Sequence, residues 1–264
     1  MTLAGPQLQA ASDLLWDCWK RRECMRELPG AMRPSTREAG YAIQALLERR
    51  SAFPLFGWKI AATSAAGQAH IAVDGPLAGR LLRERVRESG GRIPFGGNRM
   101  RVAEAEFAFR MGADLPPRAA PYQVPEALAA VATLHPAIEV PDSRFEDFTI
   151  VGAAQLIADN ACADYFVPGA AAPDSWRSLD LARHRVAGRV NAGPLREGIG
   201  ANVLGDPRDA LVWLVNELSQ LNVTLSAGQV VTTGTCIIPL PVGPGDHVVA
   251  DFGEIGTVDA WLGE

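Results

Sequence analysis

The stretch AEAEFAFRMG at residues 103–112 alternates two kinds of side chain along its length. Such alternation is typical of a β-strand, in which successive side chains point to opposite faces. One face would then carry the apolar residues of a buried core, namely Ala105, Phe107, Phe109 and Met111. The other face would carry Glu104, Glu106, Ala108 and Arg110. The stretch therefore predicts a strand with a core face and, on its opposite face, two neighbouring carboxylates.

The whole chain has the composition of a globular protein and carries no sign of a polyanionic partner. Its 264 residues have a formal net charge of −5, which does not favour nucleic acid or an anionic membrane surface. No apolar run approaches the roughly 20 residues that span a bilayer, and the first 30 residues do not resemble a signal peptide. Four cysteines without a CxxC pair are expected to be structural thiols. We therefore expect a cytoplasmic protein with neither nucleic acid nor membrane as a partner.

The pattern of elements changes near residue 57. Residues 1–56 show helical spacing, and Ser35 and Glu38 have the spacing of a capping box before a second helix. Residues 57–264 contain many short β-rich runs and one late helix, which Asp206 can cap. Strands outnumber crossover helices, so we predict an α+β fold with a mixed, largely antiparallel sheet. The expected parts are a helical N-terminal part, 1–56, and a β-rich catalytic domain, 57–264.

The two glutamates are a candidate cation site. Carboxylates two residues apart on one strand face repel each other when both are ionised in a poorly hydrated place. A divalent ion such as Mg²⁺ or Mn²⁺ removes that penalty, because hard cations prefer carboxylate oxygens. Glu139, in HPAIEV, is the best candidate for a third ligand because it is the one acid of a short apolar run. The alternative is that Glu104 and Glu106 lie on a solvated strand face.

Lys59 is the second unusual residue. It lies between Trp58 and Ile60 in GWKIAATS, a run that is otherwise apolar or small. One interpretation is an exposed lysine on a strand. The other is a partly desolvated ammonium group that faces an anionic substrate and either holds a carboxylate or transfers a proton.

An ordered set of motifs resembles the fumarylacetoacetate hydrolase superfamily. The motifs are GWKIAATS, DGPLAGRLL, EAEFAF, PAIEVPDSR, ADNACADYFVPG and TTGT…PLPVGPGDHVVADFGEIGTV, and they extend over nearly the whole chain. Within the superfamily they are most similar to the group of 2-oxopent-4-enoate hydratases and 4-oxalocrotonate decarboxylases. The resemblance implies a rolled mixed β-sheet in the catalytic domain, a helical N-terminal part, and homo-oligomers built from dimers.

The resemblance also implies roles for particular residues. Glu104, Glu106 and Glu139 match the three metal-binding carboxylates, and Lys59 matches the active-site lysine, a catalytic residue. Asp142 and Arg144 match residues that support the metal-ligand segment. The expected substrate-binding residues are Lys59, Leu77, Asp159, Asn160 and Thr235.

The activity implied by the resemblance is that of a Mg²⁺- or Mn²⁺-dependent lyase of aromatic catabolism. It would act on a small 2-oxo acid, adding water to a 2-hydroxy-2,4-dienoate to give a 4-hydroxy-2-oxo acid. Leu77 stands where many hydratases carry an aspartate, which favours a second activity, decarboxylation of a 2-oxo-3-enedioate. A C–C bond hydrolase would need a His–Glu pair that residues 59–80 do not show. A non-catalytic subunit of the same fold is the remaining alternative.

Overall fold

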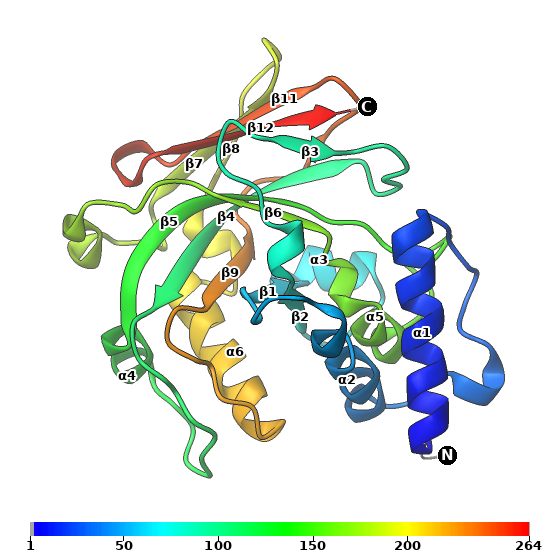
Figure 1. Cartoon of the computed structure of the whole chain (residues 1–264). Coiled ribbons are helices and arrows are strands. Elements are labelled where there is room, and N and C mark those ends of the chain that lie inside the picture. Colours follow the sequence, from blue (N-terminus) through cyan, green and yellow to red (C-terminus); the bar gives the residue numbers. More distant parts are fainter. Residues whose placement is uncertain (1–2, 264) are drawn as a thin grey trace.

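The computed structural model describes residues 3–263, which form two β-sheets with helices packed around the larger one (Figure 1). The larger sheet has seven strands in the order β2-β1-β9-β4-β5-β6, with β10 paired to β4. Its strands are β1 (Gly57–Ala61), β2 (Leu77–Leu81), β4 (Val102–Met111), β5 (Val131–Val140), β6 (Tyr165–Pro168), β9 (Val230–Thr235) and β10 (Leu240–Pro241). All of its pairings are antiparallel except that of β1 with β9.

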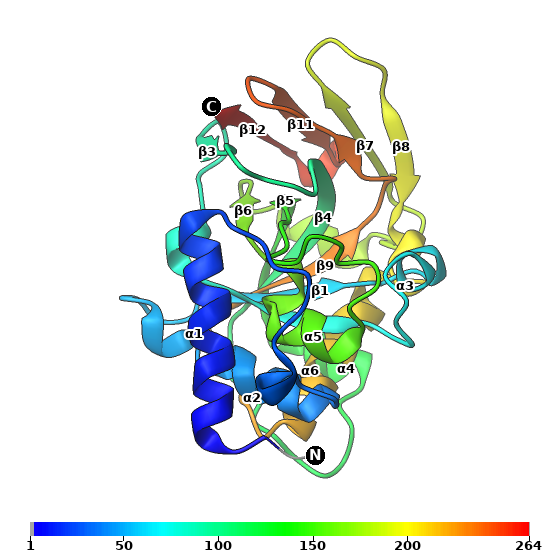
Figure 2. The same ribbon diagram turned by 90° about the vertical axis from the view of Figure 1, so that its right-hand side faces the viewer.

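The smaller sheet has five strands in the order β3-β12-β11-β7-β8. They are β3 (Arg92–Pro94), β7 (Arg185–Val190), β8 (Arg196–Ile199), β11 (His247–Asp251) and β12 (Thr257–Gly263). Figure 2 shows this sheet above the larger one, with most of the helices below. The helices are α1 (Gly5–Arg21), α2 (Arg37–Ala45), α3 (Ala65–His70), α4 (Val124–Ala129), α5 (Ala153–Ala158) and α6 (Pro207–Gln220). The predicted class, α+β with a rolled mixed sheet and N-terminal helices, is confirmed.

The strand predicted from residues 103–112 is β4, at the centre of the larger sheet. Its four predicted core residues are all at most 1% exposed, and they join the main core together with the apolar stripe of α6. The opposite face is not a solvated one, because Glu106 and Ala108 are completely buried there and only Arg110 is exposed. Both faces of the strand are therefore covered along most of its length.

Two helix starts were predicted from capping patterns, with different outcomes. Asp206 caps α6 as expected, because its side chain accepts a hydrogen bond from the Arg208 N–H. The cap of α2 is Thr36 and not Ser35: the Thr36 side chain accepts a hydrogen bond from the Ala39 N–H. The capping-box spacing was therefore assigned one residue too early.

The N-terminal helices pack against later parts of the chain. Ala11, Leu15 and Ile43 form one apolar cluster with Phe145 and with the last residue of α5. In addition, the side-chain amide of Gln44 in α2 donates hydrogen bonds to backbone carbonyls of β2 and α5. These contacts place α1 and α2 against the segment that follows β5. The division of the chain into a helical part, 1–56, and a catalytic domain, 57–264, stays a prediction.

None of the helices in residues 3–263 combines the length and apolarity that crossing a bilayer requires. The four cysteines are unpaired and three of them are buried. Burial raises the pKa of the Cys162 thiol to about 12, so this thiol stays protonated at neutral pH, as expected of a structural cysteine.

Candidate metal site

The register of two central strands brings the three predicted carboxylates together. β4 and β5 are antiparallel with Glu104 directly opposite Glu139, and Glu106 lies two residues further along β4. Directly opposed residues lie on the same sheet face, as do residues two apart. Each of the three side chains offers a carboxylate oxygen within 4.8 Å of the other two. The arrangement can hold a divalent cation.

The surroundings of these carboxylates also fit a cation. Glu106 and Glu139 are completely buried, whereas Glu104 is partly exposed and gives access to the site. Glu106 Oε2 accepts hydrogen bonds from the Thr232 hydroxyl and from the Gly234 N–H, at 2.8 Å for the latter. Within residues 3–263, neither Glu106 Oε1 nor either carboxylate oxygen of Glu139 accepts a hydrogen bond, although the Lys59 ammonium lies 3.1 Å from Glu139 Oε1 as an ion pair. Buried oxygens without donors are costly, and a hard cation bound between them would supply the missing partner.

The electrostatics of the metal-free site favour protonated carboxyl groups. Burial, followed by the charge of Glu106, raises the pKa of Glu104 to about 8. Burial, followed by the charge of Glu139, raises the pKa of Glu106 to about 8 as well. For Glu139 burial is again the largest cause, but Lys59 opposes it, and the pKa is about 7. A cation that binds here must therefore displace protons near neutral pH.

Lys59 is a buried cation on the same face. β1 is parallel to β9, and its register places Lys59 beside Thr232. The Lys59 side chain is 3% exposed, so it is not an exposed strand lysine; its Nζ lies 3.1 Å from Glu139 Oε1. It also donates a hydrogen bond of 3.1 Å to the Ala161 carbonyl. Although burial alone would lower the pKa of Lys59, Glu139 and the other two glutamates raise it, so the group stays an ammonium.

A strained turn presents the Ala161 carbonyl to this ammonium. Asn160, Ala161 and Cys162 have φ values of 56°, 50° and 60°, a left-handed conformation that non-glycine residues rarely adopt. The Asn160 amide holds the turn by accepting from the Arg80 N–H at 2.6 Å and donating to the Arg80 carbonyl at 2.8 Å. Gly79 leaves room for it, since a Cβ there would lie 2.5 Å from the Asn160 carbonyl oxygen.

Asp159 fixes the start of this turn. Its carboxylate forms a buried ion pair with Arg144 and accepts a hydrogen bond of 2.7 Å from the Ser143 hydroxyl. The Arg144 guanidinium also donates to the carbonyl of Asp142, the second residue after β5. Arg144 and Asp159 thus connect the chain after the Glu139 strand to the turn that contacts Lys59.

The structure places the other predicted substrate residues as follows. Leu77 lies opposite Ala61, hence on the same sheet face as Lys59, and is completely buried. Thr235 lies opposite Glu106, is partly exposed, and donates its hydroxyl hydrogen to the Ile237 carbonyl at 2.8 Å. The side chains of Asp159 and Asn160 are buried and bonded to the protein itself, as described above. Substrate contact by these four residues stays a prediction.

Three groups of the site were not predicted from the sequence. They are the Thr232 hydroxyl, the Gly234 N–H and the Ala161 carbonyl. Gly234 has φ of 99°, and a Cβ there would lie 2.1 Å from the Thr63 hydroxyl oxygen, so its position requires glycine. The run TTGT was noted, but only Thr235 was selected from it. Which threonine of a buried strand faces a carboxylate depends on strand register, which the sequence does not contain.

Comparisons with known proteins agree on one family. The profile of the Fumarylacetoacetate (FAA) hydrolase C-terminal family matches residues 61–262. A 2-keto-4-pentenoate hydratase of Paraburkholderia xenovorans is 33% identical over 221 residues, which are 83% of this chain and 81% of that protein. A 4-oxalocrotonate decarboxylase of a Pseudomonas species (strain CF600) is 30% identical over 204 residues, 77% of this chain and 76% of that protein.

A solved structure matches along almost the whole chain. The 4-oxalocrotonate decarboxylase from Pseudomonas putida G7, complexed with magnesium and adipate, superimposes with a TM-score of 0.90 at 26% identity and covers 99% of both chains. This chain therefore belongs to the fumarylacetoacetate hydrolase family, and within it to the enzymes of the hydratase and decarboxylase group.

Proposed function

We propose that this member of the family is a divalent-metal-dependent lyase that adds water to 2-hydroxy-2,4-dienoates, by way of the 2-oxo-4-enoate, to give a 4-hydroxy-2-oxo acid. One observation carries the proposal: three clustered carboxylates, two of them with buried oxygens that accept no hydrogen bond, share a single sheet face with one buried ammonium. This combination suits a small anionic substrate that develops further negative charge on its oxygens during reaction.

In this proposal Glu104, Glu106 and Glu139 hold Mg²⁺ or Mn²⁺. The bound ion would supply Lewis-acid stabilisation of the charge on the 2-oxo and carboxylate oxygens of the substrate. Thr232 and Gly234 fix one oxygen of Glu106, which leaves its other oxygen for the ion. The solved decarboxylase relative, whose complex contains magnesium and a dicarboxylate, supports this assignment.

Lys59 would act as a fixed positive charge. Its ammonium is held between Glu139 and the Ala161 carbonyl, so it can orient and stabilise an anionic substrate without moving far. The raised pKa argues against Lys59 as the base in the metal-free state. Leu77, Asp159, Asn160 and Thr235 complete the proposed substrate-binding set, with Leu77 as an apolar wall on the side of Lys59.

Decarboxylation of a 2-oxo-3-enedioate is the second candidate. Leu77 favours it, because a completely buried leucine beside Lys59 cannot position the attacking water that hydration requires. The high structural similarity to a decarboxylase supports the same alternative. A C–C bond hydrolase is a weaker candidate, since His70, the histidine of residues 59–80, is exposed. The small 2-oxo acid substrate, the dimer-based homo-oligomer, and the cytoplasmic location stay predictions.

The deciding experiment follows the ultraviolet absorbance of 2-hydroxypenta-2,4-dienoate with purified protein, first with Mg²⁺ or Mn²⁺ and then with EDTA. Metal-dependent decay to 4-hydroxy-2-oxopentanoate, identified by NMR, would establish hydration. Decay at the spontaneous rate only would exclude hydration of this substrate. In that case 4-oxalocrotonate is tested next, and metal-dependent release of CO₂ would establish the decarboxylase. Failure of both substrates would favour the non-catalytic subunit.

A further inference from the structure

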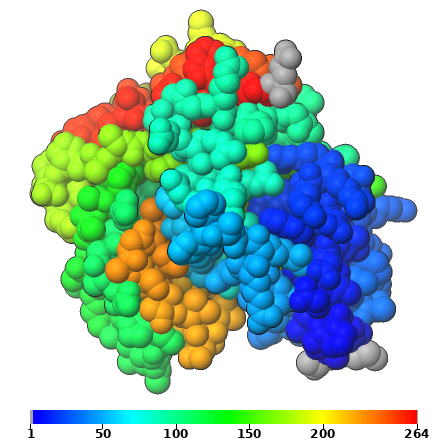
Figure 3. Space-filling model, viewed as in Figure 1, coloured from blue at the N-terminus to red at the C-terminus, as the bar shows by residue number. Residues whose placement is uncertain are grey.

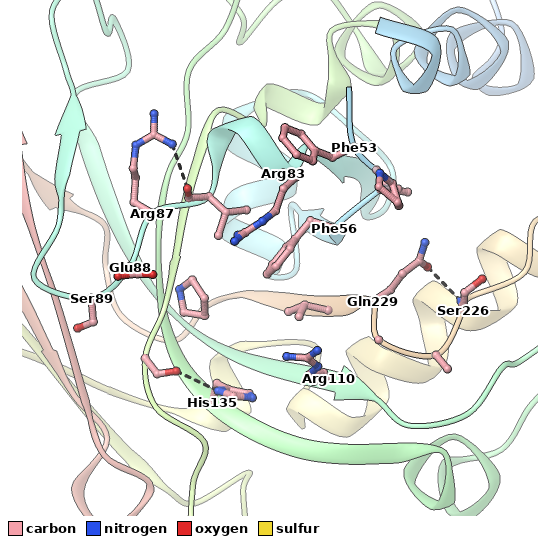
Figure 4. A pocket seen from close by; sticks show the side chains of 18 of the residues that line it. Phe53, Phe56, Arg83, Arg87, Glu88, Ser89, Arg110, His135, Ser226 and Gln229 are labelled. Atoms are coloured by element: carbon pink, nitrogen blue, oxygen red, sulfur yellow. Dashed lines mark hydrogen bonds between the residues drawn. The ribbon is translucent and has the colours of Figure 1, made fainter. Parts of the chain in front are cut away.

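A large cavity lies on the same face of the sheet as the three glutamates, at the other end of β4 and β5. Its volume is about 950 Å³, and its lining includes Arg110 of β4 and His135 of β5 (Figure 4). Arg110 follows Glu106 by four residues and His135 precedes Glu139 by four, so alternation places all of them on one face. The volume is in the range of small-molecule sites, roughly 300–1,000 Å³.

An apolar divider separates this cavity from the candidate metal site. It is the cluster of Leu81, Val86, Ala108, Ala137, Phe166 and Val230. Ala108 stands between Glu106 and Arg110 on β4, and Ala137 stands between Glu139 and His135 on β5. The residues that line the cavity include none of the three glutamates, nor Lys59. A ligand in the cavity would therefore not contact the metal site.

The charges of the cavity favour an anion. Arg83, Arg87 and Arg110 line it, against the single acid Glu88. Among the residues that the structure describes, none of these three arginines lies in an ion pair, and of the three only Arg87 donates side-chain hydrogen bonds. The exposed guanidinium of Arg110 thus retains all of its donors for a ligand.

The walls of the cavity are apolar and partly aromatic. Phe53 is 55% exposed, although large apolar side chains are usually covered, and Phe56 is also part of the lining, with Arg83 between the two rings (Figure 4). The guanidinium of Arg83, an exposed residue, lies over the Phe56 ring, 5.4 Å from its centroid, so this arginine contacts the aromatic wall. In the space-filling view the segment before β1 and the segment before β9 meet on the surface in this region (Figure 3).

The His135 imidazole also lines the cavity, and both of its ring nitrogens are bonded to the protein. One ring nitrogen lies 2.8 Å from the Thr133 hydroxyl and the other 2.9 Å from the Gly169 carbonyl, which must accept from an N–H. With both nitrogens engaged, the imidazole adds no free donor that would compete with Arg110 for the ligand. Among the described residues that line the cavity, Arg110 therefore has a guanidinium without hydrogen bonds or an aromatic contact, and the surrounding walls are largely apolar.

We propose that this cavity is a second binding site, and that it takes an aromatic monocarboxylate. The planar fork of Arg110 matches a carboxylate with two parallel hydrogen bonds. The ring of the ligand would lie against Phe53 and Phe56, where a small inorganic anion would leave the apolar walls uncovered. The proposal does not rest on the proposed activity, because the two sites share no lining residue.

The test is isothermal titration calorimetry of the full chain in EDTA, so that no metal can bind a carboxylate. The probe is 2-naphthoate, with neutral 2-naphthamide as its matched control. We expect one 2-naphthoate per chain, binding that persists in Glu106→Gln, and a Kd for the amide at least about tenfold higher. Arg110→Gln should raise the Kd for 2-naphthoate by at least about tenfold, whereas Arg189→Gln, an exposed arginine of β7, should leave it unchanged.

Three outcomes would overturn the proposal. The first is no heat of binding at millimolar 2-naphthoate. The second is binding that Arg110→Gln leaves intact, which would place the probe elsewhere. The third is a dimer in sedimentation velocity that Phe53→Ser converts to monomers, because a second copy of the chain would then cover the cavity. Circular dichroism melts of each variant separate loss of binding from loss of fold.

Discussion

Four ionisable groups are buried side by side at the candidate metal site, and their charges do not balance. Three carboxylates face one ammonium, which lies next to Glu139, and within residues 3–263 the Thr232 hydroxyl and the Gly234 N–H donate to one oxygen of Glu106. Burying charge without partners is expensive, so the metal-free protein keeps protons there instead. At the scale of single residues, the site is therefore set up to exchange protons for a divalent ion.

Removing one ligand should remove the ion. We expect Glu106→Gln to weaken Mn²⁺ binding by more than about 100-fold, beyond the usual cost of losing an outer partner of a metal ligand. Isothermal titration calorimetry measures this, with Glu254→Gln, an exposed glutamate, as the matched control. Glutamine preserves the size of the side chain, so the protein should remain folded. Unchanged Mn²⁺ affinity in the variant would refute the three-carboxylate site.

The raised pKa values make both stability and metal binding depend on pH. Between about pH 4.5 and pH 8 the folded metal-free protein holds protons on these glutamates that the unfolded chain has lost. Its free energy of unfolding should therefore fall as pH rises through this window, since the folded state binds more protons. Mn²⁺ affinity should rise over the same window.

Thermal melts in EDTA and in excess Mn²⁺, at several pH values, test this expectation. Saturation at about 100 times the Kd should add about 2.7 kcal/mol of stability at any given pH. In Glu106→Gln the decline in EDTA should become shallower, because one of the titrating groups is gone. A metal-free protein that gains stability between pH 5 and pH 8 would contradict the assignment of buried protonated carboxyls.

Lys59 is one of only two lysines in the chain, which provides a matched control. Lys59→Met keeps most of the apolar stem and removes the charge, so turnover should fall by about 10²–10³-fold, as for loss of one preorganised donor. Mn²⁺ affinity should be retained or improved, because a positive charge next to Glu139 is removed. The exposed Lys20→Met should change neither quantity. A large loss of Mn²⁺ affinity in Lys59→Met would make the lysine a support of the metal site.

At the scale of elements, strands place the charges and turns support them. β4 and β5 contribute the carboxylates and β1 contributes the lysine, while the turn at residues 160–162 supplies the carbonyl that Lys59 contacts. Three consecutive left-handed residues cost of order 1–2 kcal/mol each and persist only when neighbours hold them. Here the Arg80 backbone and the Arg144–Asp159 pair do so.

Glycine at the centre of this turn should relieve the strain. Ala161→Gly should raise the free energy of unfolding by about 1 kcal/mol, since glycine adopts positive φ without the steric penalty. The comparison is Ala158→Gly in α5, where glycine should instead lower it by about 0.5–1 kcal/mol. Urea unfolding of both variants gives the two values. Equal losses in both would show that the turn is unstrained.

The sequence predicted elements well and their contacts only in part. Alternation identified β4 and its core face, and the helical spacing and Asp206 identified α6, because these signals are local. Glu139 was selected as the third ligand because it is the one acid of a short apolar run, and the family resemblance supported the choice; its register opposite Glu104 is not written in either strand. The Thr232 hydroxyl and the Ala161 carbonyl were missed for the same reason. Short strands such as β3 and β8 carry too few residues to show a pattern.

At the scale of the whole molecule, one large sheet links all of these features. The N-terminal helices of the chain pack against the segment after β5 through the apolar cluster that contains Leu15 and Phe145. The same strands extend from the candidate metal site, across the apolar divider, to the cavity at Arg110. Packing of the helices should therefore affect the stability of the entire chain.

We expect Leu15→Ala to lower the free energy of unfolding by about 2–5 kcal/mol, since Leu15 is only 4% exposed in that cluster. Hydrogen exchange measured by mass spectrometry is the test, with peptides from α1 and from β4. Both peptides should lose protection together if the chain unfolds as one unit. Lost protection in α1 alone would mean that residues 1–56 unfold separately, as the predicted division at residue 56 allows.

Two of the groups that hold the candidate metal site are main-chain atoms. The Gly234 N–H fixes Glu106, and the Ala161 carbonyl fixes Lys59. Every residue has a backbone carbonyl and every residue except proline has an N–H, so most substitutions keep both groups as long as the backbone keeps its conformation. Substitutions that damage this site directly are therefore concentrated at its four charged residues and at Gly79 and Gly234, where a side chain would collide with neighbouring atoms.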